Sequence, residues 1–316
     1  MIYFDVTKSG ASSHRSGLMR VSSRLGTGLA GAATGVSWPA WGRVVQPGDW
    51  FLTAELFSEE ERPGFGDFLR QRPCRLAAIF YDAIPLRFPH ITWPKSVARH
   101  PSYMKLLAGF DRVWAISEAS RDELIGFWRW QGVERIPPVD VLALGADFNA
   151  ISRTISRALP PAPSLLGVGI LEPRKNQRFL LDVCARLWEE GLQFDLHLVG
   201  RVNPHFGAPI ETEIRILRKI YPGLHYHRTV DDAAMAQLYA TAWASVCPTQ
   251  AEGCGLPLLE SLWMGVPCVC SDLPVLRENA SAGGCLTVAL NNAPAWQEAL
   301  RELLTDDTLV ARLTAE

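Results

Sequence analysis

Two glutamates lie on either side of a glycine turn in the segment PTQAEGCGLPLLESLWMGVPCVCSD, which runs from residue 248 to 272. Gly253 and Gly255 favour a positive φ and let the main chain approach a ligand closely. Pro257 suits the first turn of a helix, where its missing N–H costs nothing. We therefore expect the amides of residues 253–256 to point out of a helix start, where the helix dipole favours an anion such as phosphate.

The two carboxylates suit hydroxyl groups better than they suit the anion itself. We expect Glu260 in the first helical turn, where it would repel bound phosphate but could accept from two adjacent hydroxyls of a ribose. Glu252 precedes the turn, where a sugar joined to the other end of a diphosphate would lie. A glutamate near a helix start is also common for stability alone. The binding roles depend on the E-x7-E spacing with glycines and a proline between.

Two cations follow the apolar run at 165–169, in LLGVGILEPRKNQRFLLDV. Arg174 and Lys175 would lie at the carboxyl end of a strand, where they could neutralise the charge of a departing diphosphate. Gly167 and Gly169 do not belong to a dinucleotide fingerprint, because the third glycine position is Glu172. The simpler alternative is a solvated basic turn.

Short apolar runs alternate with helical patterns along the chain, which favours parallel sheets covered on both faces. The predicted strands are 2–6, 50–54, 76–81, 112–116, 139–144, 165–169, 195–199, 224–227, 244–247 and 268–270. The predicted helices are 18–25, 120–129, 176–190, 210–220, 235–241, 257–264 and 294–304, the last being the only helix expected at the C-terminal end. The proline-rich segment ISRTISRALPPAPS reads as a linker. We predict an α/β fold of two doubly wound, Rossmann-like domains, 1–157 and 158–316, facing across a cleft.

The segment EGCGLPLLESLWMGVPCVCSDLPVLRE resembles the signature of the family 4 retaining glycosyltransferases (glycosyl transferases group 1), which have the GT-B architecture. Cys254 stands where the family usually has an aromatic residue, and Ser261 where it usually has alanine. The resemblance implies that Glu260 holds the ribose and that Glu252 contacts the donor sugar. It places the donor phosphates on four main-chain amides: those of Gly253, Cys254, Gly255 and Leu256. The segment GILEPRKN resembles the second family motif, which implies that Lys175 binds phosphate with Arg174 beside it.

Two stretches of the N-terminal half resemble one subgroup of that family. IFYDAIPLRFPH is similar to H-D-x-I-P-L, with Tyr81 in place of the histidine, and Asp82 would orient acceptor hydroxyls or support the sugar. A turn residue that caps its own loop is the alternative for Asp82. RSGLMRV is similar to T-G-I-x-R-V, in which Gly17 would let the loop approach donor or acceptor and Arg20 would meet phosphate. A plain helix start is the alternative there.

Residues 83–109 contain no acids but carry several cations and aromatic rings. These residues are Arg87, Lys95, Arg99, Lys105, Phe88, Trp93 and Tyr103. Such a surface suits an anionic acceptor, such as a lipid diphosphate, or an anionic membrane face. A solvated loop region is the alternative.

Composition narrows the class of protein. Lys and Arg number 31 against 33 acids, so a general nucleic-acid binder is not expected. The seven cysteines form no C-x-x-C pair, which favours reduced thiols over zinc or a disulfide framework. The first ten residues lack the apolar core of a signal peptide, and no apolar run approaches the ~18 residues of a membrane span. We expect a cytoplasmic protein that could also lie peripherally on the inner membrane face.

Together these features predict a retaining glycosyltransferase that moves a sugar from a nucleotide-diphosphate sugar to a glycan or lipid-linked acceptor. Glu252, Asp82 and Lys175 would be its catalytic residues. The family implies that the acceptor attacks from the leaving-group face and that the departing phosphate takes its proton. We expect no cofactor and no obligatory metal, because no D-x-D pair occurs at a strand end. The alternatives are a sugar-nucleotide epimerase of the same architecture and a catalytically silent binding subunit.

Overall fold

The computed structural model describes residues 1–10, 17–40, 44–147, 152–154 and 160–316. The chain divides into two compact units, Met1–Leu144 and Gly145–Glu316, which are described separately here. The boundary predicted at 157/158 lies outside the described residues.

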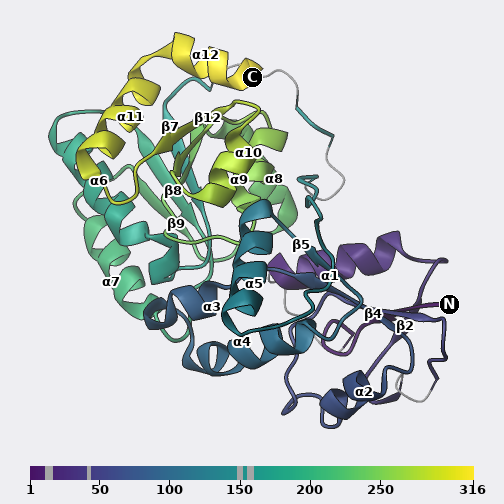
Figure 1. The fold of residues 1–316 in the computed structure, drawn as a ribbon. Coiled ribbons are helices and arrows are strands. Elements are labelled where there is room, and N and C mark those ends of the chain that lie inside the picture. Colours follow the sequence, from purple (N-terminus) through teal and green to yellow (C-terminus); the bar gives the residue numbers. More distant parts are fainter. Residues whose placement is uncertain (11–16, 41–43, 148–151, 155–159) are drawn as a thin grey trace. The chain divides into compact units, whose positions relative to one another are not determined.

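Within its described residues, unit 1 contains a six-stranded parallel sheet with the order β2-β1-β3-β4-β5-β6 (Figure 1). Its strands are β1 (Ile2–Asp5), β2 (Thr34–Val36), β3 (Trp50–Thr53), β4 (Arg75–Phe80), β5 (Arg112–Ala115) and β6 (Val139–Val141). Its helices are α1 (Gly17–Gly28), α2 (Phe65–Gln71), α3 (Ile84–Arg87), the 3-10 turn η2 (Pro89–Ile91), α4 (Pro94–Leu107) and α5 (Glu118–Trp130). The core is rich in aromatic side chains, with Phe51, Phe80 and Trp128 fully buried.

Unit 2 contains a second six-stranded parallel sheet, with the order β12-β11-β10-β7-β8-β9. Its strands are β7 (Ser164–Val168), β8 (Asp195–Val199), β9 (Leu224–His227), β10 (Ala244–Cys247), β11 (Cys268–Ser271) and β12 (Cys285–Val288). Its helices are η3 (Pro173–Lys175), α6 (Gln177–Glu189), α7 (Gly207–Leu217), α8 (Asp232–Thr241), α9 (Leu256–Trp263), α10 (Pro274–Ala280), α11 (Ala293–Thr305) and α12 (Asp307–Ala315). One face packs Leu165, Leu196 and Val269 under α6, α7 and α11, and the other packs Leu166 and Val199 under α8. Helices thus cover both faces, as the apolar strands require.

Each sheet has a point at which the strand order reverses. In unit 1 the chain runs from β1 to β2 on one side and from β3 to β6 on the other. In unit 2 the reversal lies between β7 and β10. Ligands of open parallel sheets bind beyond the carboxyl ends of the strands at such points. The predicted α/β fold with two doubly wound sheets is confirmed.

Each strand predicted from the sequence coincides with a strand of the structure, but β2 and β12 were not predicted. The expectation of a single helix at the C-terminal end is wrong, because α12 follows α11 directly. Asp306 separates them, and its side chain accepts from the amides of Thr308 and Leu309 to start α12. In the part of the chain that is described, no helix has both the length and the apolarity needed to cross a bilayer.

Candidate functional site

Two loops that are distant in the sequence are joined at the strand-order reversal of unit 2. Asn176, which has a left-handed φ of 58° and immediately precedes α6, donates from Nδ2 to the carbonyl of Pro248 at 3.0 Å. The carbonyl of Arg174 accepts from the amide of Gln250 at 2.8 Å and from Oγ1 of Thr249 at 3.0 Å. These bonds fix the loop after β7 against the loop after β10. The two sequence motifs therefore belong to one site.

The charged side chains of both loops form one largely shielded cluster. Nζ of Lys175 lies 2.5 Å from Oε1 of Glu252, and Nη1 of Arg174 lies 3.1 Å from Oε2 of the same carboxylate. Arg174 also contacts Glu172 through Nη2 at 2.7 Å, and Asn203 donates to the other oxygen of Glu172 at 2.9 Å. Two cations thus face two carboxylates, and the cluster is close to neutral before any ligand binds.

The protonation state of Glu252 follows from its surroundings. The side chain is only 7% exposed. Burial by itself raises the pKa of Glu252, but Lys175 and Arg174 outweigh burial and lower the pKa to about 2. Glu252 is therefore ionised at neutral pH, and it holds both cations in place.

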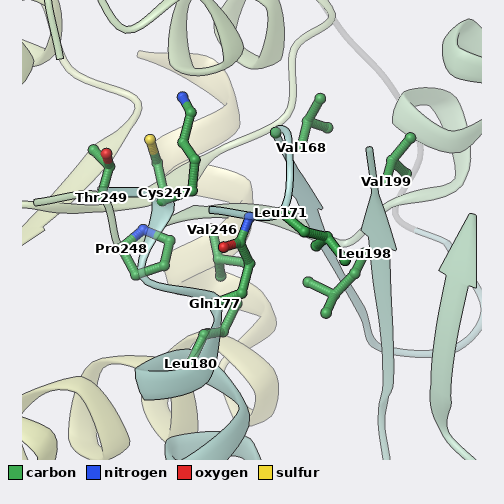
Figure 2. Close-up of a pocket in the computed structure, with 13 residues that line it drawn as sticks. Val168, Leu171, Gln177, Leu180, Leu198, Val199, Val246, Cys247, Pro248 and Thr249 are labelled. Atoms are coloured by element: carbon green, nitrogen blue, oxygen red, sulfur yellow. The ribbon is translucent and has the colours of Figure 1, made fainter. Parts of the chain in front are cut away.

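A pocket opens beside this cluster at the carboxyl ends of β7, β8 and β10. Figure 2 shows Thr249, Cys247 and Pro248 on one side of it and Val168 and Val199 on the other. Lys175 also lines it, together with Gly167 and Gly169. The cation is therefore presented to a cavity rather than enclosed in the core.

Two glycines near this pocket, Gly200 and Gly167, are closely packed. A Cβ on Gly200 would lie 2.0 Å from the carbonyl oxygen of Gly169, and one on Gly167 would lie 3.0 Å from Cδ2 of Leu198. Because Gly167 and Gly169 line the pocket and have no side chains, part of its lining is main chain.

The glycine turn lies at the start of α9. Gly255 has a φ of 78° and precedes the first helical residue, Leu256. A Cβ there would lie 2.5 Å from Cδ2 of Leu276, so this position requires glycine for both its conformation and its packing. The carbonyl of Cys254 accepts from Nδ2 of Asn279 at 2.5 Å, and burial raises the pKa of the Cys254 thiol to about 12. Cys254 is therefore a neutral, packed side chain, and Gly253 beside it is also buried.

Glu260 lies deeper than the sequence suggested. The expectation that it occupies the first turn is wrong, because α9 begins at Leu256 and its first turn contains no acid. Glu260 is 5% exposed, and the hydroxyl of Tyr239 donates to its Oε2 at 3.4 Å. A ribose role for Glu260 stays a prediction.

In unit 1, Asp82 follows β4 and caps its own turn. Its Oδ1 accepts from the amide of Ile84 at 2.9 Å, as the turn alternative predicted. Tyr81 is buried, and its hydroxyl donates to the carbonyl of Ala54 at 2.7 Å. Gly17 is the exposed first residue of α1. Ligand contacts of Asp82 and Gly17 stay predictions.

The basic surface expected at residues 83–109 is present in part, and its contact with an acceptor or membrane stays a prediction. The segment contains α3 and α4 rather than a loop, and Tyr103 is buried in the core. Arg99 pairs with Glu60 at 2.5 Å and with Glu61 at 2.9 Å, and Arg87 pairs with Glu123. The acids missing from the segment are supplied by other segments of unit 1, so two of its cations are already neutralised.

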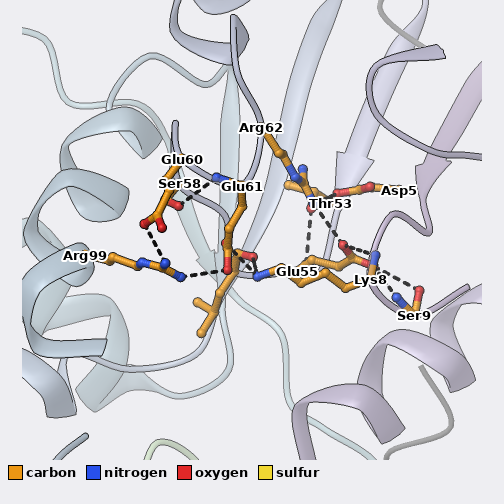
Figure 3. Close-up of polar contacts among 11 residues, drawn as sticks. Asp5, Lys8, Ser9, Thr53, Glu55, Ser58, Glu60, Glu61, Arg62 and Arg99 are labelled. Carbon is orange, nitrogen blue, oxygen red and sulfur yellow. Dashed lines mark hydrogen bonds and ion pairs between the residues drawn. The ribbon is translucent and has the colours of Figure 1, made fainter. Parts of the chain in front are cut away.

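One charged cluster was not predicted from the sequence. Arg62 is fully buried, and its Nη2 lies 2.6 Å from Oδ2 of Asp5 and 2.8 Å from Oε2 of Glu55 (Figure 3). Glu55 also accepts from the amides of Lys8 at 2.9 Å and Ser9 at 2.8 Å, which attaches the loop after β1 to the end of β3. Burial, then Asp5, raises the pKa of Glu55. In the sequence, the feature that could have indicated this cluster was one acid, Asp5, at the end of the first apolar run.

Comparisons with known proteins agree with the fold and the motifs. Residues 162–306 match the family model described as glycosyl transferases group 1. The serotype-specific mannosyltransferase WbdA of Escherichia coli is 29% identical over 244 residues, which cover 72% of this chain and 29% of WbdA. The O-antigen chain mannosyltransferase B of Escherichia coli is 29% identical over 252 residues, covering 76% of this chain and 64% of that protein. The chain thus spans less than a third of WbdA.

Solved structures resemble the whole chain. The Anabaena protein HepE, solved in complex with UDP and glucose, is 14% identical with a TM-score of 0.73, and the match covers 99% of this chain and 92% of HepE. Sucrose-phosphate synthase from Thermosynechococcus elongatus is 17% identical with a TM-score of 0.72 and the same coverage of both chains, 99% and 92%. The chain has the two-domain GT-B fold, and its residues 162–306 are similar to the glycosyl transferases group 1.

Proposed function

We propose that this protein is a retaining glycosyltransferase. It transfers a sugar from a nucleotide-diphosphate sugar to a hydroxyl of a glycan or lipid-linked acceptor, in the synthesis of a cell-surface polysaccharide or glycoconjugate. The observation that supports this most directly is the cluster of Lys175, Arg174 and Glu252 at the strand-order reversal of unit 2, beside the start of α9. Cations and a helix start at such a position suit a diphosphate.

Each group of this site receives a role in the proposal. Lys175 binds the diphosphate, together with the amides of residues 253–256. Glu252, released from Lys175 when the anion arrives, accepts from hydroxyls of the transferred sugar. Glu260 accepts from the ribose, with Tyr239 holding one of its oxygens.

The transfer step follows from the placement of charge. The bond between the anomeric carbon and the phosphate oxygen breaks while the acceptor oxygen bonds to that carbon from the same face, so the configuration is retained. The acceptor proton moves to the departing phosphate oxygen. Lys175 and the helix start stabilise the negative charge that develops there. In this proposal the cation and the helix supply that stabilisation, and no metal ion is obligatory.

The transferred sugar is proposed to be mannose, because the curated relatives described above are mannosyltransferases. We place the protein in the cytoplasm, with peripheral contact to the membrane when its acceptor is lipid-linked. Trp93, which is 53% exposed with Nζ of Lys95 5.9 Å from its ring centroid, supports such contact.

A thermal-shift and turnover screen tests the proposal. Nucleoside diphosphate mannoses with guanine, uracil, adenine and thymine bases are added to the full chain, and the melting midpoint and the release of free nucleoside diphosphate are recorded. One of them is expected to raise the midpoint, since a ligand that binds only the folded state stabilises it. Lys175→Met is expected to abolish the shift, whereas Lys219→Met, at an exposed lysine of the same unit, is expected to retain it.

The same screen separates the alternatives. An epimerase would convert the sugar without releasing the nucleoside diphosphate. A silent subunit would bind without turnover even when candidate acceptors are supplied. The anomeric configuration of the product, read by NMR, decides between retention and inversion.

A further inference from the structure

Histidines lie on one face of β8 and β9, the outer strands of the second sheet. These histidines are not among the residues that line the pocket. His197 of β8 is opposite His225 of β9 in the register, and Val199 is opposite His227. Because side chains alternate along a strand, Asp195 and His197 share one face with His225 and His227. Their neighbours Leu196, Leu198 and Leu224 point to the other face and are buried in the core.

The polar groups of this row lie at ligand spacing. Nε2 of His225 is 3.2 Å from Oδ1 of Asp195, and one donor atom from each of Asp195, His197 and His225 lies within 4.8 Å of the other two. The rings of His197 and His225 stack with centroids 4.6 Å apart. Tetrahedral zinc bonds of about 2.0–2.1 Å place neighbouring ligand atoms about 3.3 Å apart, so small side-chain rotations complete the set.

The surroundings leave this row open to an ion. The side chain of His225 is 37% exposed and that of Asp195 50% exposed. β9 is the edge strand of the sheet, and α8, which follows it, packs on β7 instead. His225 and Asp195 are therefore open to solvent, and His197 lies half-buried beside them, at an edge that has a hydrogen-bonded strand on one side only.

We propose that Asp195, His197 and His225 bind one divalent transition-metal ion of the zinc class, which fastens the edge strand β9 to β8. Imidazole nitrogen and carboxylate oxygen are ligands that zinc accepts. His227 orients the site, because its Nε2 lies 3.0 Å from Nδ1 of His197. Water fills the remaining position.

Calorimetric titration of the full chain, freed of metal with a chelator and carrying no histidine tag, tests this inference. The probe is Zn²⁺ alone. We expect one ion per chain and at least a tenfold loss of affinity in His197→Ala and in His225→Gln. The control His205→Ala changes an exposed histidine of the same unit outside this row, and its affinity is expected to equal that of the native chain.

Unfolding supplies a second readout. Zn²⁺ at a hundred times its dissociation constant is expected to raise the ratio of folded to unfolded protein about a hundredfold in the native chain, but not in Asp195→Asn. Asp195 is half exposed, so this variant is expected to fold. Absence of stoichiometric binding, or equal affinity in the native chain, His197→Ala and His225→Gln, would overturn the inference. Neither outcome bears on the proposed transferase function, because that function is tested by donor binding and turnover.

Discussion

Replacing Glu252 by glutamine removes the anion that Lys175 and Arg174 of the candidate site both contact. The substitution keeps the size and shape of the side chain, so its main effect is electrostatic. In the native chain the Glu252 carboxylate contacts Lys175 at 2.5 Å and Arg174 at 3.1 Å while only 7% exposed. In the variant Lys175 loses this counter-charge, whereas Arg174 keeps its ion pair with Glu172. We therefore expect Glu252→Gln to be less stable than the native chain at neutral pH.

The size of this effect can be worked out from the pKa of Glu252. It falls from 4.5, the ordinary value, to about 2 in the folded protein. At about 1.36 kcal/mol for each pKa unit, ionisation of Glu252 contributes on the order of 3 kcal/mol to stability at pH 7. Because the folded pKa is depressed, this contribution is complete above pH 4.5 and is lost as the pH falls toward 2. At pH 3.5 about 1.4 kcal/mol of it has disappeared.

Urea unfolding of both proteins at pH 7, 5 and 3.5, followed by circular dichroism, measures this difference. Titrations common to both proteins cancel, so the stability gap is expected to be similar at pH 7 and 5 and smaller at pH 3.5. The control Glu213→Gln removes a carboxylate that pairs with Arg178, whose side chain is 66% exposed. Such surface pairs contribute about 0–1 kcal/mol. A gap for Glu252→Gln that is no larger than the control, or that does not change between pH 5 and pH 3.5, would refute the electrostatic role assigned to Glu252.

Three further substitutions test other parts of the structure. Gly255→Ala forces a Cβ to within 2.5 Å of Leu276, at a φ of 78°. We expect the free energy of unfolding to fall by about 1 kcal/mol or more. The thermal shift given by a nucleoside diphosphate sugar is expected to become smaller. Glu260→Ala is expected to reduce the thermal shift given by nucleoside diphosphates while leaving binding of inorganic diphosphate intact; an unchanged nucleotide shift would argue against a ribose contact. Arg62→Ala leaves Asp5 and Glu55 buried without their counter-charge, which typically costs about 3–5 kcal/mol. A loss below 1 kcal/mol in urea unfolding would contradict the buried pairing of Arg62.

The strands that could be predicted from the sequence are those with a short run of residues in which at least every second side chain is apolar or buried, whether one face is covered or both. The strands at 195–199, 224–227 and 244–247 were located to the residue. The strand β2 was missed because Thr34–Val36 has three residues and a central glycine, and its place depends on pairing with β1. The helix α4 was missed because prolines stand at positions 94 and 101, and its stability comes from packing of His100, Tyr103 and Met104 in the core.

In the candidate site, too, features encoded in one short segment were predicted, whereas contacts between distant segments were not. Chemical type and spacing indicated Lys175, Glu252 and the turn at Gly255, because these features are encoded within short segments. The pairing of Lys175 with Glu252 was not predicted, since it depends on the contact between the loops after β7 and β10. The cluster of Asp5, Glu55 and Arg62 was missed for the same reason, because the three residues meet only when β1 and β3 lie side by side.

The two glycines that line the pocket, Gly167 and Gly169, have a consequence for ligand selectivity. Main chain has no rotamers, so this part of the pocket loses no side-chain entropy when a ligand enters and has one fixed contour. A larger residue at Gly200 would collide with the opposite backbone instead of reshaping the cavity. If the pocket holds the donor of the proposed transferase, selectivity among donors depends on wall side chains such as Val168, Val199 and Thr249 rather than on the two glycines.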